Sequence, residues 1–159
     1  MNIALILAGG TEQRMGQSIP KQFLNVNDIP VIVYTLHAFK IHQNIDAIEV
    51  VCLDGWHDIL RAYAEQFGIT KLENIVSGGK NGQDSIRNGL YDIASRHSND
   101  DDIVLVHDGI RPNVSEDIIS DNIRVCRQYG NAITVIPCNA AMLRTTDGLQ
   151  STAQVPRDN

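Results

Sequence analysis

Short apolar runs alternate along the chain with longer segments whose apolar residues recur at helical spacing. Runs that predict strands lie at residues 2–7, 47–53, 74–76, 103–106 and 132–136, and segments that predict helices lie at 30–39, 58–67, 84–96 and 115–130. A run as continuously apolar as 2–7 is typical of a parallel strand that is buried on both faces. The alternation predicts an α/β domain with a mostly parallel sheet and right-handed crossovers.

Residues that favour helix boundaries stand near the ends of the predicted helices. Pro30 suits the first position of a helix, and Gly68 suits the position that follows one. Gln83 or Asp84 is expected to cap the helix over 84–96, and Ser115 is a favourable N-cap for the last helix. The boundary residues therefore agree with the apolar spacing.

The pattern changes near the end of the chain. Two extended runs, 142–144 and 149–151, flank a Thr-Thr-Asp-Gly segment, and an Asp-Gly turn between extended runs predicts a β-hairpin. We therefore expect a single domain over 1–159, with a β-arm over 138–157 inside it. Because no closing element follows the arm, we expect this domain to be incomplete at its carboxyl end.

The bulk composition limits the classes of partner. The chain has 159 residues and a formal net charge of −6, so a sequence-independent grip on nucleic acid or on an anionic membrane is not expected. The sequence shows neither a secretory leader pattern nor an apolar run of membrane-spanning length, so we expect a cytoplasmic protein. Three widely spaced cysteines without a CxxC pattern favour small core residues over a disulfide framework or a zinc site.

Functional groups follow three of the predicted strands, where ligands bind in open α/β sheets. The first group lies in LAGGTEQRMGQSIPKQF, residues 7–23. Gly9 and Gly10 can turn tightly and present backbone N–H groups to an anion, while Arg14 and Lys21 add two cations. Backbone donors combined with cations suit a triphosphate. The segment matches neither the Walker pattern nor GxGxxG, so it predicts a different kind of phosphate-binding loop.

The second group lies in SGGKNGQDSIRNGL, residues 77–90, just before a predicted helix. Gly79 precedes that helix and Ser85 stands in its first turn. Polar residues at this place commonly cap the helix and nothing more. Because helix N-termini also attract anions and polar ligands, the same residues could face a ligand.

The third group is VHDGIRP, residues 106–112, which follows another predicted strand. Asp108 stands where a carboxylate can hold Mg²⁺ between phosphates. It could equally form a structural ion pair with Arg111 across the turn. His107 is expected to orient neighbouring groups or to be partly buried, rather than to act as a base.

Together these segments resemble the 2-C-methyl-D-erythritol 4-phosphate cytidylyltransferases and, equally, the related ribitol-5-phosphate cytidylyltransferases. The resemblance continues through VIPCNAAML to VPRDN, in order and spacing, and covers essentially the whole chain. It implies a Rossmann-like, three-layer nucleotidyltransferase fold and a Mg²⁺-dependent reaction of CTP with a polyol phosphate, giving a CDP-polyol and pyrophosphate. Methylerythritol phosphate, an isoprenoid precursor, is the first expected acceptor, and ribitol 5-phosphate, for cell-wall or capsule polymers, is the alternative.

The resemblance also implies roles for single residues. Arg14 and Lys21 would be catalytic, because they would stabilise charge on the α-phosphate and on the leaving group. Arg111 and Arg157 would serve the polyol phosphate, with Arg157 reaching the other subunit's substrate. The protruding β-arm over 138–157 would join two chains in a homodimer. The nucleotide would lie against Ala8, Gly9, Gly10, Gly79, Ser85 and Asp108, the last of which would also hold Mg²⁺.

Three departures from the family pattern bear on function. Gly82 stands where family members usually carry an arginine, and Ala140-Ala141 stand where Asp-Thr is common, near the polyol phosphate. Family members also continue for roughly half again as much chain, a length consistent with usual domain sizes. We therefore expect this chain to be a fragment that is poorly active by itself.

Two other classes of protein are alternatives. A truncated, non-catalytic nucleotide-binding protein would fit the short chain, but the joint presence of Arg14 and Lys21 argues against it. A dinucleotide oxidoreductase would fit the fold class alone. It is disfavoured because the chain lacks both the GxGxxG pattern and the acid that binds the ribose.

Overall fold

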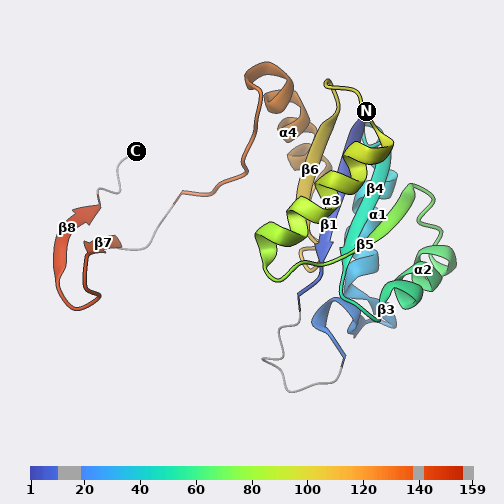
Figure 1. Ribbon diagram of the computed structural model, residues 1–159, viewed down its shortest axis with the longest axis horizontal. Helices are drawn as coiled ribbons and strands as arrows, with labels where there is room; N and C mark the ends of the chain where they lie inside the picture. Colours follow the sequence, from blue (N-terminus) through green and yellow to red (C-terminus); the bar gives the residue numbers. More distant parts are fainter. Residues whose placement is uncertain (11–18, 138–141, 156–159) are drawn as a thin grey trace.

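A four-stranded parallel sheet forms the centre of the computed structural model, which describes residues 1–10, 19–137 and 142–155 (Figure 1). The strands are β1 (Asn2–Ala8), β4 (Ala47–Cys52), β5 (Leu72–Ser77) and β6 (Ile103–Asp108), in the order β5-β4-β1-β6. Every neighbouring pair in this sheet is parallel. Because all four strands run the same way, the turns after them gather at one edge of the sheet.

Helices cover both faces of the sheet and make three layers. The helices α1 (Val31–Ile41), α2 (His57–Gln66) and α4 (Glu116–Tyr129) pack on one face, and α3 (Gly82–Arg96) lies across the other (Figure 1). Ala4 and Ile6 of β1 belong to the first core, whereas Ile3 and Leu5 belong to the core under α3. This two-sided burial explains the continuous apolar run and confirms the predicted Rossmann-like α/β fold.

Three of the predicted helix boundaries are confirmed. The Ser115 hydroxyl caps α4 by accepting a hydrogen bond from the Ile118 N–H at 3.3 Å. Gly130 ends the same helix with φ of 86°, and Gly68 follows α2 with φ of 62°. Both values lie in the left-handed region, which glycine adopts at little cost, so these residues stop the helices where the sequence indicated.

Two other boundary predictions were wrong by a residue or more. The N-cap of α3 is Asn81, not Gln83 or Asp84, and its side chain accepts from the Asp84 N–H at 2.9 Å. Pro30 is the N-cap of α1 rather than its first helical residue. It is held by a short antiparallel pairing of β2 (Asn25–Val26) with β3 (Ile29–Pro30), and this pairing extends the backbone up to the proline.

The strand predicted at 132–136 is absent. Residues 131–137 have no regular secondary structure, and Ile133 and Val135 are 82% and 79% exposed. A strand needs hydrogen-bonding neighbours, but within the described residues β6 pairs only with β1. A groove of about 660 Å³, lined by β6, α4 and residues 130–134, lies beyond the free edge of β6. The β-branched residues of 132–136 therefore indicated an extended segment. They could not indicate whether another strand would pair with it.

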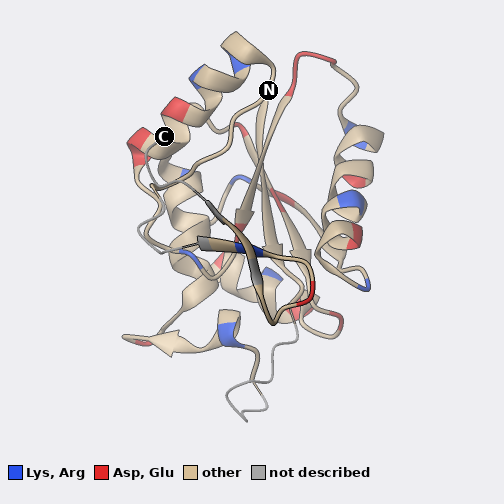
Figure 2. Ribbon diagram, turned by 90° about the vertical axis from the view of Figure 1, so that its left-hand side faces the viewer, with Lys and Arg blue, Asp and Glu red and all other residues tan. Residues whose placement is uncertain are grey.

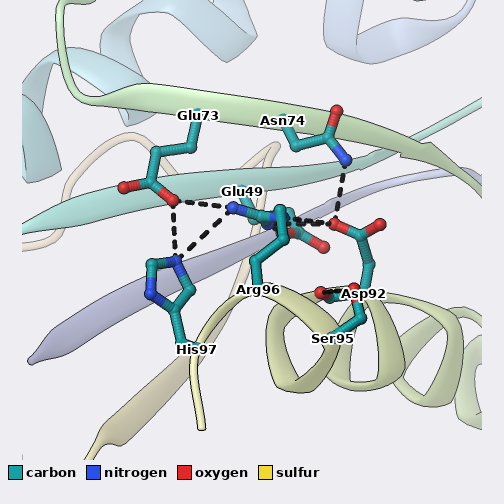
Figure 3. Close-up of polar contacts among 7 residues, drawn as sticks. All are labelled: Glu49, Glu73, Asn74, Asp92, Ser95, Arg96 and His97. Atoms are coloured by element: carbon teal, nitrogen blue, oxygen red, sulfur yellow. Dashed lines mark hydrogen bonds and ion pairs between the residues drawn. The ribbon is translucent and has the colours of Figure 1, made fainter.

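A charged network joins the carboxyl-terminal end of α3 to β4 and β5, and it consists of Glu49, Glu73, Asn74, Asp92, Arg96 and His97 (Figure 3). Arg96 lies between the acids: it donates to Glu73 at 2.7 Å, pairs with Asp92 at 2.9 Å and contacts the fully buried Glu49. Burial first, and then the nearby Asp92, raise the pKa of Glu49 to about 8 against the attraction of Arg96. The Glu49 carboxyl is therefore largely neutral at pH 7.

The predicted hairpin is confirmed as β7 (Met142–Thr145) paired antiparallel with β8 (Ser151–Val155), and it stands apart from the sheet in Figure 1. Its second strand begins at Ser151, because residues 149 and 150, which were expected to be extended, belong to the turn. The N–H groups of Gln150 and Leu149 donate to the Asp147 carboxylate at 3.0 and 2.8 Å and lower its pKa. The Asp-Gly turn therefore supplies its own hydrogen bonds. The assignment of 138–157 as a dimerisation arm stays a prediction.

Charged residues are spread over the helices. Figure 2 shows basic and acidic segments interspersed along them in the view it presents. The formal net charge of the whole chain is −6. None of the helices in the described ranges is long and apolar enough to cross a membrane.

Candidate functional site

The turn after β1 and the segment after β5 meet above the end of β4. The Gly78 N–H donates to the carbonyl of Cys52, the last residue of β4, at 2.9 Å, so the chain leaving β5 crosses toward β1. A β-carbon placed on Gly9 would lie 3.4 Å from the Gly78 Cα and 3.8 Å from the Ser85 Oγ. Only small residues allow this approach, so the first and second predicted segments form one surface.

Gly79 is held against the first turn of α3. Its N–H donates to the Ser85 Oγ at 2.9 Å. A β-carbon on Gly79 would lie 2.3 Å from the Asp84 Cβ and 2.7 Å from the Asp84 carbonyl carbon. Ser85, in the first turn of α3, therefore helps to order the glycine turn that precedes the helix. The sequence alone had allowed simple helix capping as its whole role.

Replacing Gly79 with alanine should destabilise the protein by about 1–3 kcal/mol, because the new methyl group overlaps backbone that must move. The matched control is Gly82→Ala at the first residue of α3, where a β-carbon meets nothing within 4 Å. That control should be neutral or slightly stabilising, since alanine favours a helix. Urea unfolding of the two variants checks the prediction, and equal free energies of unfolding for both would contradict it.

The segment after β6 is anchored to the end of β1 on its other side. The Gly109 N–H donates to the Leu7 carbonyl at 2.8 Å, and the buried Thr35 hydroxyl donates to the Gly109 carbonyl at 2.9 Å. The third predicted segment thus lies beside the β1 turn. All three segments are brought to one edge of the sheet, as their positions after parallel strands predicted.

Asp108 and Arg111 form the ion pair that was one of the two interpretations of this segment. The Arg111 Nε donates to the Asp108 carboxylate at 2.6 Å, and the two side chains are 73% and 48% exposed. His107 is half-buried, with a ring nitrogen 2.9 Å from the Arg111 carbonyl and its ring against Phe39. His107 therefore supports the turn, as expected, and leaves the exposed carboxylate of Asp108 at the surface.

Lys21 begins a short 3₁₀ helix, η1 (Lys21–Phe23), and is half-buried. The next residue, Gln22, is a functional candidate that the sequence did not reveal. Its amide donates to the carbonyls of Ala8 at 2.8 Å and Gly10 at 3.2 Å. The sequence does show that Gln22 follows Lys21 in a glycine-rich segment. Sequence spacing alone does not show that the Gln22 side chain points back at the glycine turn.

Several predicted residues cannot be placed. Arg14, Arg157 and Ala140-Ala141 lie outside the described residues. Gly82, where family members usually carry arginine, is exposed at the start of α3 with space around it. The fold therefore does not require glycine there.

Asp108 offers a carboxylate to a metal at this edge. The described residues contain no group of three or more His, Cys, Asp or Glu side chains placed to hold a metal ion. Mg²⁺ commonly uses one or two carboxylates together with the phosphates of a bound nucleotide, and an exposed Asp108 fits that requirement. Cys52 is unsuited to nucleophilic chemistry, because burial raises the pKa of its thiol to about 12.

The fold and this edge define a parallel α/β domain in which glycine turns, a helix N-terminus and an exposed carboxylate meet at the carboxyl ends of β1, β5 and β6. The chain belongs to the 2-C-methyl-D-erythritol 4-phosphate cytidylyltransferase (IspD) family, whose sequence model matches residues 2–157. The resemblance that the three segments suggested is therefore confirmed at the level of the family.

Relatives with two different names are similar to this chain. A ribitol-5-phosphate cytidylyltransferase of Lacticaseibacillus paracasei is 48% identical over 139 residues, covering 87% of this chain and 59% of the relative. One of Streptococcus agalactiae is 39% identical over 158 residues, covering 99% and 66%. A 2-C-methyl-D-erythritol 4-phosphate cytidylyltransferase of Clostridium botulinum is 38% identical over 148 residues, covering 92% and 63%.

Solved structures agree with the fold. A crystal structure of a 4-diphosphocytidyl-2C-methyl-D-erythritol synthase matches with a TM-score of 0.70 and 26% identity, covering 98% of this chain and 68% of that one. A synthase from Anaerococcus prevotii matches with a TM-score of 0.76 and 25% identity, covering 99% and 64%. In the comparison with the three named relatives of the preceding paragraph, the chain spans 59–66% of their length.

Proposed function

We propose that this protein is a cytidylyltransferase that joins CMP from CTP to a polyol phosphate. The observation that carries the proposal is the meeting of three segments at one edge of the sheet, with Gly9 against Gly78 and Gly109 bonded to Leu7. This edge offers backbone donors, a helix N-terminus and a carboxylate, which together suit a nucleotide and its phosphates. Family membership selects cytidylyl transfer among the reactions that such a site could support.

In the proposed reaction, a phosphate oxygen of the polyol attacks the α-phosphorus of CTP, and the bond to the β-phosphate breaks to release pyrophosphate. The turn of Ala8, Gly9 and Gly10 and the Gly79–Ser85 turn would hold the nucleotide. Lys21 and Arg14 would stabilise negative charge on the α-phosphate and on pyrophosphate. Asp108 would help to hold Mg²⁺, which when bound would supply positive charge against the phosphates.

Arg111 supports this assignment through Asp108. The ion pair of 2.6 Å orients the carboxylate and leaves much of both side chains exposed. We propose that Arg111 keeps Asp108 directed toward the nucleotide and faces the polyol phosphate. Arg157, by family resemblance, would contact the acceptor phosphate from the neighbouring subunit of a cytoplasmic homodimer joined through the β7–β8 arm.

Ribitol 5-phosphate is the acceptor that the relatives favour. The relative of that name from Lacticaseibacillus paracasei is 48% identical to this chain, compared with 38% for the methylerythritol phosphate enzyme of Clostridium botulinum. The three segments themselves resemble both groups and do not separate the two acceptors. We therefore place ribitol 5-phosphate ahead of methylerythritol phosphate, the acceptor that the sequence alone put first.

A side-by-side assay on the full product of the encoding gene tests this proposal. Pyrophosphate release is measured with CTP, Mg²⁺ and either ribitol 5-phosphate or methylerythritol phosphate, with UTP and ATP as control nucleotides. We expect the higher kcat/KM with ribitol 5-phosphate and little turnover with the control nucleotides. Higher kcat/KM with methylerythritol phosphate would reverse the choice of acceptor, and no CTP-dependent release with either would contradict the proposed function.

A further inference from the structure

Gln22 places a buried amide beneath the glycine turn after β1. The residue is 2% exposed, and its Nε2 lies 2.8 Å from the Ala8 carbonyl oxygen and 3.2 Å from that of Gly10. An amide nitrogen carries two N–H donors, so one side chain can hold both carbonyls. Burying an amide is unfavourable unless its hydrogen bonds are made. These two bonds therefore offset the cost of burying the Gln22 amide.

The neighbours of Gln22 fix the point from which the amide donates. The Phe23 N–H donates to the Pro20 carbonyl at 2.9 Å and closes the turn of η1. The ring of Phe23 is buried and stacks on Trp56 with ring centroids 4.5 Å apart. The amide therefore starts from an anchored helix turn rather than from a free loop.

Holding the Ala8 carbonyl also determines where the Gly9 N–H points. A trans peptide is planar, with the C=O of one residue opposite the N–H of the next. With the Ala8 carbonyl directed at Gln22, the Gly9 N–H of the same peptide is directed away from it. Glycine backbones otherwise adopt many conformations, so without the amide the turn could rotate these groups.

We propose that Gln22 is a positioning residue: by holding the Ala8 carbonyl, it sets the direction in which the glycine turn presents the Gly9 N–H to the phosphates of a nucleotide. The identity of that ligand as CTP rests on the proposed function. Gln22 acts through the turn and does not itself touch the ligand. Gln22 is adjacent to Lys21 in η1. The same short helix therefore positions both the glycine turn and the backbone of the proposed phosphate-binding cation.

The experiment compares Gln22→Met with the parent and with Gln66→Met, the same change at an exposed position at the end of α2. Methionine keeps a similar side-chain length but has no donor. Glycine amide resonances are recorded by NMR on protein labelled with ¹⁵N-glycine, and CTP is then titrated in the presence of Mg²⁺. We expect Gln22→Met alone to move or broaden the Gly9 and Gly10 resonances, and to weaken CTP binding by about tenfold or more.

A second variant, Gln22→Glu, separates hydrogen bonding from space filling. An ionised carboxylate has no donor and faces two carbonyl oxygens, whereas a protonated carboxyl can donate to one of them. CTP affinity of Gln22→Glu, divided by that of the parent at each pH, should therefore rise as the pH falls. The same ratio for Gln22→Met should stay flat, because methionine does not titrate.

Each outcome decides a different claim. Parental Gly9 and Gly10 resonances in Gln22→Met, or altered resonances with parental CTP affinity, would overturn the positioning role. A pH-independent ratio for Gln22→Glu would also overturn it. A parent protein that binds no CTP would instead contradict the proposed function, while the glycine resonances of Gln22→Met would still decide whether Gln22 orders the turn.

Discussion

Replacing Lys21 with alanine is expected to lower kcat/KM for cytidylyl transfer by about 100-fold or more and to leave the protein folded. Removing one preorganised group that stabilises developing charge commonly costs catalysis this much. Lys21 begins η1, directly before the Gln22 amide that holds the carbonyls of the glycine turn. The backbone of Lys21 is thus held next to the proposed phosphate site.

The measurement is initial-rate kinetics with CTP and ribitol 5-phosphate on the full gene product. Arg61→Ala, which removes an exposed cation from α2, is the matched control and should retain parental kcat/KM. Arg14→Ala should show a loss similar to that of Lys21→Ala, in keeping with the paired roles proposed for them. Near-parental kcat/KM in both site variants would show that these cations do not stabilise the transition state.

Replacing Glu49 with glutamine is expected to make the protein more stable at pH 8–9 and to change its stability little at pH 5. The folded-state pKa of Glu49 is raised from 4.5 to about 8, first by burial and then by Asp92. Between these values the folded protein holds a proton that the unfolded chain releases, so stability falls as the pH rises and levels off above about 8. Glutamine stays neutral throughout and removes this loss, which is on the order of a few kcal/mol.

Urea unfolding at several pH values from 5 to 9 measures this effect. Arg96 keeps Asp92 and Glu73 as partners in the variant, so the network of Figure 3 survives the change. Glu65→Gln, on the exposed surface of α2, controls for the chemical change itself. If Glu49→Gln lost stability with pH as steeply as the parent, Glu49 would not be the buried acid that carries this dependence.

The sheet could be predicted from the sequence because β1 and its neighbours are buried on both faces. Strands buried in this way have continuous apolar runs, such as residues 3–7. It was wrong at 132–136 because an extended segment becomes a strand only when another strand pairs with it. The composition of Ile133 and Val135 contains no information about that partner. Helix caps were misplaced for a similar reason, since Asn81 and Asp84 are both good caps and the tertiary position of α3 selects between them.

The candidate site was predictable where parallel strands bring their ends together, and less so where backbone groups do the binding. Gly9, Gly79 and Asp108 follow strands, so their convergence could be anticipated. The contact of Gly9 with Gly78 and the donation by Gln22 depend on how loops fold back, which spacing does not encode. Sequence therefore located the edge, and structure identified the side chain that holds its first turn.

The most direct measurement is a crystal structure of the protein with CTP and Mg²⁺. We expect the triphosphate on the turn of Gly9 and Gly10, with Lys21 beside it, the metal near Asp108 and the nucleoside against Gly79 and Ser85. The groove between β6 and α4, lined in part by residues 131–134, is a cavity of about 660 Å³ beyond the free edge of β6. A nucleotide bound in that groove, with the edge formed by β1, β5 and β6 empty, would contradict the account.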